Sequence, residues 1–62
     1  MITLTEALSG ATHIEEYLFC YEGLYISMDP GEETNWLMVS LDQKDWDCFP
    51  PNASIEEVRS QL

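Results

Sequence analysis

Basic residues are almost absent from this chain of 62 residues. Lys44 and Arg59 are the only two, against twelve Asp and Glu residues, so the formal net charge is −10 at pH 7. A surface this acidic argues against direct binding to nucleic acid or to an anionic membrane, because both require basic side chains. It favours attraction to proteins that carry a basic surface.

Cysteines and long apolar runs are scarce as well. Cys20 and Cys48 are the only cysteines, and no apolar stretch reaches the length of a membrane span or forms a signal peptide. We therefore expect a cytoplasmic protein with both thiols reduced. The three glycines stand far apart, which excludes the glycine-rich loop that binds phosphates.

Motifs for catalysis and metal binding are also missing. His13 is the only histidine, and its spacing to Cys20 and Cys48 matches no metal or nucleophile motif. In the segment 42–47 the carboxylates stand at the first, fourth and sixth positions, unlike the alternating ligands of a calcium loop. We expect no enzyme activity, no metal and no cofactor. A Cys/His enzyme or metal site is kept only as a remote alternative.

Apolar residues are sufficient for one small domain spanning residues 1–62. They make up 45% of the chain and include two Trp, three Tyr and two Phe residues. A chain of this length buries about 60% of the surface that its unfolded form exposes, so its stability is expected to be marginal. Association with a partner or with a second copy would add to that stability.

The bulky residues between Tyr17 and Leu41 predict a three-stranded antiparallel meander over about 15–21, 24–29 and 35–42. If residues 22–23 form a two-residue turn, Phe19 and Val39 lie on either side of Ile26. Alternation then places nine uncharged residues on one face, which is the predicted core face. They are Tyr17, Phe19, Tyr21, Leu24, Ile26, Met28, Leu37, Val39 and Leu41.

Short helices are expected at both ends of the chain. Thr3 and Glu6 have the spacing of a capping box and predict a helix within residues 1–9, while Ser54 predicts the start of a closing helix. Residues 43–51 show no clear period and are expected to form an ordered loop. The predicted fold is therefore α+β, with the helices packed on the core face of the sheet.

A helical alternative exists for residues 12–28. Apolar residues such as Tyr17, Tyr21 and Leu24 also recur there at helical spacing. In that case the protein would be mostly α, with a short hairpin. Gly23 disfavours this alternative, because a glycine inside a helix costs about 1 kcal/mol.

The opposite face of the predicted sheet is half apolar, and Tyr25, Trp36 and Met38 are its largest residues. A fully solvated sheet face is expected to be more polar. Trp46 and Phe49, in the following loop, are the residues that could cover it from within the chain. If it stays uncovered, its aromatic and Met side chains can anchor a partner inside a rim of carboxylates.

The sequence thus predicts a small acidic protein-binding module, an inhibitor or adaptor of a basic partner such as a nucleic-acid-binding protein. The alternative is a homodimer or assembly subunit that associates through the half-apolar face or an open edge strand. The predicted binding residues are Tyr25, Trp36, Met38, Glu32, Glu33, Asp45 and Asp47.

Overall fold

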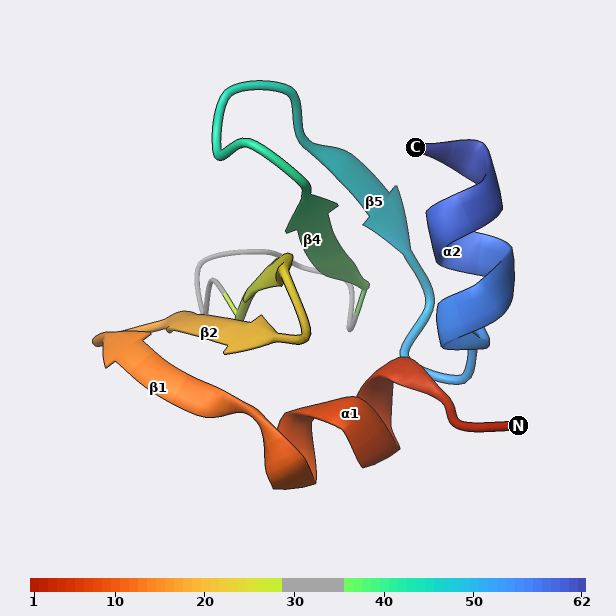
Figure 1. Ribbon diagram of the computed structural model, residues 1–62, viewed down its shortest axis with the longest axis horizontal. Coiled ribbons are helices and arrows are strands. Elements are labelled where there is room, and N and C mark those ends of the chain that lie inside the picture. The colour runs from red at the N-terminus through yellow and green to blue at the C-terminus, as the bar shows by residue number, and fades with distance from the viewer. Residues whose placement is uncertain (29–35) are drawn as a thin grey trace.

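Two short helices and a five-stranded antiparallel sheet make up the computed structural model, which describes residues 1–28 and 36–62 (Figure 1). The sheet follows chain order, so each strand pairs with the next one along the sequence. The fold is α+β, as predicted. Its elements are α1 (Leu4–Gly10), β1 (Thr12–Glu15), β2 (Leu18–Tyr21), β3 (Leu24–Ser27), β4 (Leu37–Ser40), β5 (Asp47–Phe49) and α2 (Ile55–Gln61).

The register of the three central strands agrees with the prediction. Phe19 pairs with Ile26, and Ile26 pairs with Val39 on the other side. The turn between β2 and β3 consists of Glu22 and Gly23, both with positive φ, at 46° and 83°. Two residues with positive φ are typical of the tight hairpin turn whose twist matches that of the strands.

The structure excludes the helical alternative and corrects two details of the predicted elements. Residues 12–28 form β1, β2 and β3, so the helical alternative is excluded. Residues 43–51 are not all loop, because Asp47–Phe49 pairs with β4 as a fifth strand. The described strands are also shorter than the predicted ranges of 15–21, 24–29 and 35–42, of which residues 29 and 35 lie outside the described part.

The two helices begin side by side. Thr3 and Ser54, their N-cap residues, form an isolated antiparallel bridge. The backbone N–H of Leu4 donates to the carbonyl of Ala53 at 2.9 Å, and that of Ile55 donates to the carbonyl of Ile2 at 2.8 Å. The residue that precedes each N-cap therefore supplies an acceptor for the first N–H of the other helix, a group with no partner inside its own helix.

The side chains of the N-cap residues satisfy further N–H groups. Thr3 and Glu6 form the predicted capping box, and the Ser54 hydroxyl accepts from the Glu57 N–H at 3.1 Å. Figure 1 shows the starts of both helices close to the N-terminus, with α2 running beside β5. The two ends of the chain are thereby fixed against the sheet.

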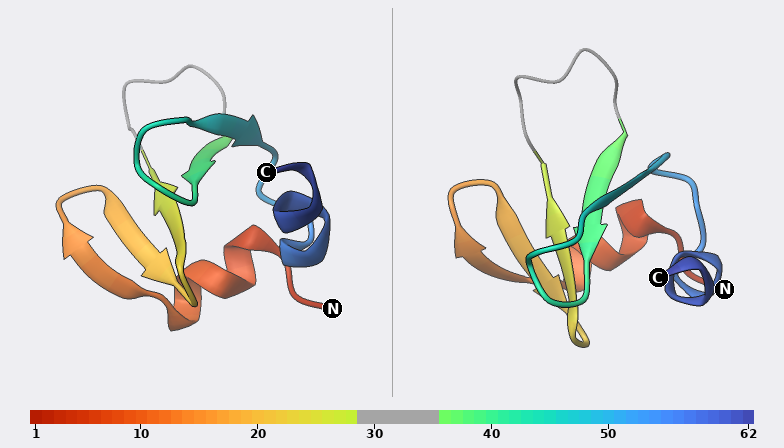
Figure 2. Two further views of the ribbon diagram at one scale, coloured as in Figure 1. Left: turned by 45° about the horizontal axis from the view of Figure 1, so that its top comes forward. Right: turned by 90° about the horizontal axis from the view of Figure 1, so that it is seen from above.

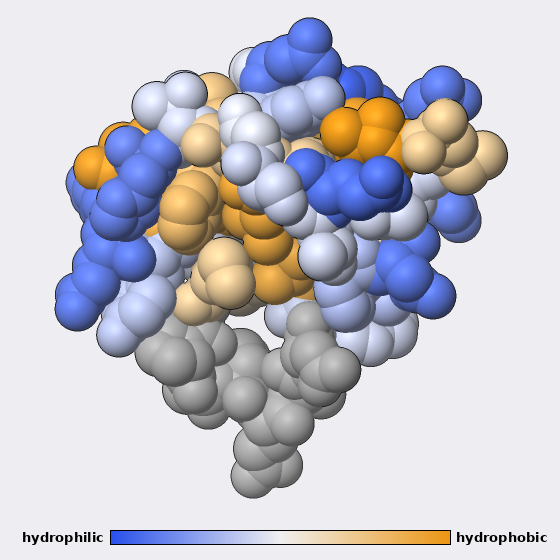
Figure 3. Space-filling view, turned by 90° about the horizontal axis from the view of Figure 1, so that it is seen from below, coloured by the Kyte–Doolittle hydropathy of each residue, from blue (hydrophilic) through white to orange (hydrophobic). Residues whose placement is uncertain are grey.

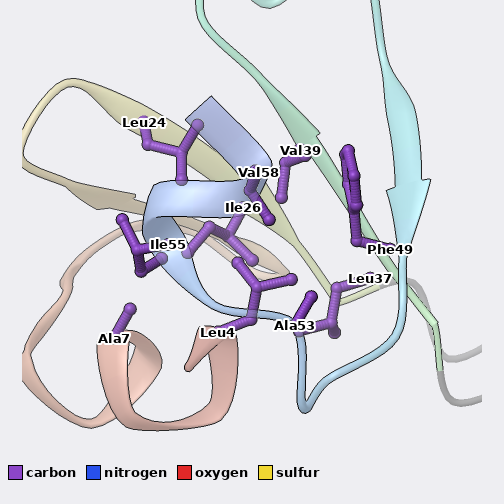
Figure 4. Close-up of a cluster of buried hydrophobic side chains, with 10 residues drawn as sticks. All are labelled: Leu4, Ala7, Leu24, Ile26, Leu37, Val39, Phe49, Ala53, Ile55 and Val58. Atoms are coloured by element: carbon purple, nitrogen blue, oxygen red, sulfur yellow. The ribbon is translucent and has the colours of Figure 1, made fainter. Parts of the chain in front are cut away.

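The hydrophobic core lies between the helices and the core face of the sheet (Figure 4). α1, the sheet and α2 all contribute to it, and the segment after β5 adds Ala53. Of the nine residues of the predicted core face, Leu24, Ile26, Leu37 and Val39 are buried. Tyr17, Met28 and Leu41, at the ends of the strands, stay between 42% and 50% exposed.

Apolar surface therefore remains accessible beyond the reach of the helices. Figure 3 shows the molecule from below, where apolar side chains gather at the centre of the visible face between hydrophilic ones. The side chain of Arg59, in α2, donates to the carbonyl of Glu22 at 3.0 Å. The guanidinium group thus connects α2 to the turn between β2 and β3.

The paired helix starts predict the effect of removing one cap. Ser54→Ala is expected to lower the free energy of unfolding by about 1 kcal/mol, because the Glu57 N–H loses its acceptor. Ser54→Asn keeps an acceptor at the same position and is the matched control. Urea unfolding of the three proteins measures the difference, and equal stability of Ser54→Ala and wild type would contradict the assigned role.

Candidate functional site

The second face of the sheet is the side away from the helices. In the observed register its residues include Leu18, Cys20, Tyr25 and Met38, all of them half-buried. The face is therefore neither fully covered nor bare. The loop 41–46, between β4 and β5, turns back over β3 on this side of the molecule (Figure 2).

Ser40 fixes the start of this loop. Its side chain is fully buried, although it ends the β4 strand on the second face. The Ser40 hydroxyl accepts from the backbone N–H groups of Asp42 at 3.2 Å and Gln43 at 2.8 Å, and it donates to Asp42 Oδ1 at 3.0 Å. Gln43 has a φ of 65°, which is uncommon for a residue with a side chain, and these bonds hold it there.

The Asp42 carboxylate continues the same network. Its Oδ1 also accepts from the backbone N–H groups of Lys44 at 2.8 Å and Asp45 at 3.1 Å. These backbone hydrogen bonds, together with the one from Ser40, hold the pKa of Asp42 below its ordinary value of 3.8. The loop is thus ordered by one buried hydroxyl and one ionised carboxylate.

A hollow of about 410 Å³ opens between the loop and the turn that joins β1 to β2. We call it the aromatic hollow, because one aromatic ring comes from each side, Tyr17 from the turn and Trp46 from the loop. Leu18 and Ser27 come from the paired strands β2 and β3. Its complete lining is Glu15, Glu16, Tyr17, Leu18, Ser27, Gln43 and Trp46.

A second, smaller hollow of about 180 Å³ lies between the loop and the C-terminal end of α2. We call it the aspartate hollow, because three of its six lining residues are aspartates. Leu41, which is 50% exposed, adds an apolar side chain. The lining is Leu41, Asp42, Asp45, Asp47, Gln61 and Leu62. The two hollows therefore share the segment 41–47, with five carboxylates between them.

The structure places the predicted binding residues in different parts of the molecule. Asp45 and Asp47 meet in the aspartate hollow. Tyr25 and Met38 are half-buried on the second face, and neither lines either hollow. Trp36 is 51% exposed and precedes β4. The remaining two, Glu32 and Glu33, lie outside the described residues.

Of the two residues that could cover the second face from within the chain, only Trp46 lies against it. Trp46 is half-buried and meets Leu18 and Ser27 of the second face at the aromatic hollow. Phe49 is instead buried in the core. The reason is the β5 strand, in which Phe49 pairs with Leu37 and so faces the helices, as Leu37 does.

Sequence reasoning missed Glu15, Glu16, Tyr17 and Gln43 as site residues. The first two were recognisable as an adjacent acidic pair, but they line the same hollow as Trp46 because Glu15 ends the β1 strand, which was not predicted. All four residues of β1 are exposed, so the strand has no alternation of buried and exposed positions to reveal it. Gln43 joins the hollow through its unusual backbone conformation.

The side chains considered for catalysis do not converge. His13 stacks on Phe19, with ring centroids 4.9 Å apart, and therefore lies on the core side of the sheet. Cys20, the next residue along β2 from Phe19, faces the opposite side. Among residues 1–28 and 36–62, no three His, Cys, Asp or Glu side chains are placed to bind a metal ion together.

Comparison with protein-family models, with curated proteins and with solved structures finds no match for this chain. Within the described ranges, neither helix is long and apolar enough to cross a membrane. The features of the described residues that bear on function are the half-buried second face of the sheet and the hollows on either side of the segment 41–47.

The Ser40 network predicts a loss of stability when the hydroxyl is removed. Ser40→Ala leaves the N–H groups of Asp42 and Gln43 without their acceptor in a partly buried place, which costs about 1–3 kcal/mol of unfolding free energy. Ser60→Ala, on the exposed side of α2, is the control and is expected to change stability by less than about 0.5 kcal/mol. Chemical unfolding of both variants tests this, and equal costs would contradict it.

The lowered pKa of Asp42 predicts a pH dependence. Because the folded state favours the ionised carboxylate, its contribution is complete above the ordinary value of 3.8 and is lost as pH falls through the lower folded-state pKa. The stability of wild type minus that of Asp42→Asn should therefore shrink on acidification below 3.8. Asp45→Asn controls for net charge, and a difference that stays constant or grows would contradict the account.

Proposed function

We propose that this protein is a small acidic protein-binding module, an inhibitor or adaptor that binds a partner with a basic surface. The observation that carries the proposal is the pair of hollows around the segment 41–47. Five carboxylates line them, from Glu15 and Glu16 on one side to Asp42, Asp45 and Asp47 on the other. Neither hollow is lined by Lys or Arg, so the local charge of both is negative.

The charge of the whole chain supports the same conclusion. At a formal −10, the protein attracts cationic surfaces at long range and repels nucleic acid and anionic lipid. One of the two basic side chains, Arg59, is engaged with backbone carbonyls of the β2–β3 turn. Electrostatic attraction accelerates association, and contacts with partly buried apolar side chains then slow dissociation.

Apolar side chains beside the carboxylates supply these short-range contacts. Tyr17 and Trp46 line the aromatic hollow, and Leu41 lines the aspartate hollow. Tyr25, Trp36 and Met38 remain residues predicted to anchor the partner on the wider surface. Apolar anchors surrounded by polar groups are the usual composition of a protein interface. We further propose that the protein acts in a reducing cytoplasm, in keeping with the free thiols of Cys20 and Cys48.

A homodimer is the second candidate, and the β1 strand favours it. β1 is an edge of the sheet, paired only with β2, and all four of its residues are exposed. An open edge can add a strand from a second copy. Sedimentation separates the candidates, because a dimer at micromolar concentration without a partner supports this one, whereas the binding module can be a monomer.

Binding to basic proteins, and its salt dependence, test the main proposal. In a panel of purified basic proteins with isoelectric points above about 9, we expect at least one to bind tightly at low salt. The affinity should fall steeply between about 0.01 M and about 1 M salt, since the screening length decreases from about 30 Å to about 3 Å. Titration calorimetry measures both effects.

Asp45→Asn combined with Asp47→Asn should weaken this binding, because it removes two carboxylates of the aspartate hollow. Glu56→Gln combined with Glu57→Gln removes the same charge from the exposed start of α2, outside both hollows, and should weaken it less. Absence of binding throughout the panel at low salt, or affinities that salt does not change, would refute the proposal.

A further inference from the structure

The aromatic hollow combines two kinds of group that attract the same type of ligand. Tyr17 and Trp46 offer aromatic rings, and Glu15 and Glu16 offer carboxylates at the same opening. A cation placed over an aromatic face is attracted by the negative charge density of the ring. Carboxylates add charge-assisted hydrogen bonds to the same cation. The lining therefore favours an organic cation above a neutral or anionic group.

The choice among cations follows from shape and donor pattern. An arginine guanidinium is planar, so it stacks on an aromatic ring, and its N–H groups match the two oxygens of a carboxylate. Neutral acceptors are also present, since Ser27 and Gln43 complete the polar lining. A lysine ammonium provides a point charge without the flat surface. The hollow is thus better suited to arginine than to lysine.

The occupant must come from another protein. This chain has only two basic side chains, so a second copy could offer only Lys44 or Arg59. The guanidinium of Arg59 donates to the carbonyls of Tyr21 and Glu22, and Lys44 belongs to the loop 41–46 that itself forms one side of the hollow. A second copy approaching the same surface would also bring its own net charge of −10.

Hydrogen bonds within the chain order both sides of the hollow. Ser40 and Asp42 order the loop through five hydrogen bonds of 2.8–3.2 Å, four of which are donated by the backbone N–H groups of residues 42–45, next to Trp46. On the other side, the Met28 N–H donates to the Tyr17 carbonyl at 2.8 Å and fixes the turn. A preformed site loses less conformational entropy on binding than one that must be assembled by its ligand.

We propose that the aromatic hollow receives an arginine side chain of the basic partner, with the guanidinium stacked between Tyr17 and Trp46 and paired with Glu15 or Glu16. This inference rests on the proposed function, since it assigns one contact within that interface. It identifies Trp46, which sequence reasoning treated as internal cover, as part of a recognition site.

A defined peptide tests the inference without knowledge of the natural partner. The probe is a short labelled peptide in which arginines alternate with glycines, and its binding is followed by fluorescence anisotropy at low salt. Matched peptides carry lysine or the uncharged isostere citrulline in place of arginine. We expect the arginine peptide to bind tightest and the citrulline peptide to show no binding.

Variants of the hollow are then compared on the arginine peptide. Trp46→Leu, and Glu15→Gln combined with Glu16→Gln, are each expected to weaken binding by about tenfold, the effect of losing one cation–aromatic or ion-pair contact. Trp46→Phe keeps an aromatic ring and should retain most of the affinity. Glu56→Gln combined with Glu57→Gln matches the change in net charge outside the hollow and should weaken binding less than about threefold.

The possible failures of the two proposals are distinguishable. If the arginine peptide binds in a salt-dependent manner but the hollow variants behave like the Glu56 and Glu57 control, the hollow is not the arginine site although the acidic module stands. Equal binding of the lysine or citrulline peptide would also overturn the assignment to arginine. If neither the peptide nor any basic protein binds, the proposed function itself fails. Circular dichroism of each variant verifies folding. If Trp46→Leu unfolds, the double variant Glu15→Gln with Glu16→Gln still tests the hollow.

Discussion

The mutual hydrogen bonding of the two helix starts is the constraint on which the rest of this structure depends. Thr3 and Ser54 come from opposite ends of the chain, yet they pair directly, and each helix accepts the first N–H of the other through a neighbouring carbonyl. Without this contact the core face would lose its cover, because both helices pack on that one side. A domain of this size has little other buried surface to compensate.

Both helices cover one face of the sheet. In the described part of the chain, the loop 41–46 lies over the other face. That loop is too short to conceal the sheet, but the Ser40 hydroxyl and the Asp42 carboxylate give it a fixed shape. Hollows remain on both of its sides, and carboxylates line each of them. Because both helices of this small domain pack on one face of the sheet, an ordered, negatively charged and partly apolar surface remains around the loop.

How much of this was predictable depends on how each element is buried. Leu24 and Ile26 of β3 and Leu37 and Val39 of β4 are buried at alternate positions, and this apolar alternation made the register of Phe19, Ile26 and Val39 predictable from the sequence alone. The caps at Thr3 and Ser54 were also recognisable, since they depend on local spacing. By contrast, β1 is exposed throughout, and β5 has only three residues, of which only Phe49 is buried. Neither strand carries a usable periodic signal.

The candidate site was less predictable than the fold, for a related reason. Its hollows join side chains from the β1–β2 turn, the loop 41–46 and the end of α2, and only the pairing of β1 and β5 with the sheet brings these segments together. Acidic composition drew attention to Asp45 and Asp47, which line the aspartate hollow together. It could not show that Glu15 and Glu16 would share an opening with Trp46.

The proposal with the widest consequences is that a basic partner binds the surface around the segment 41–47. Its most direct test is nuclear magnetic resonance of the ¹⁵N-labelled protein during titration with the peptide of alternating arginine and glycine. The largest chemical-shift changes are expected on the Trp46 indole N–H and on the backbone of Tyr17, Leu18 and Gln43, which line the aromatic hollow. Changes concentrated on α1 or α2, or spread evenly over all exposed carboxylates, would contradict it.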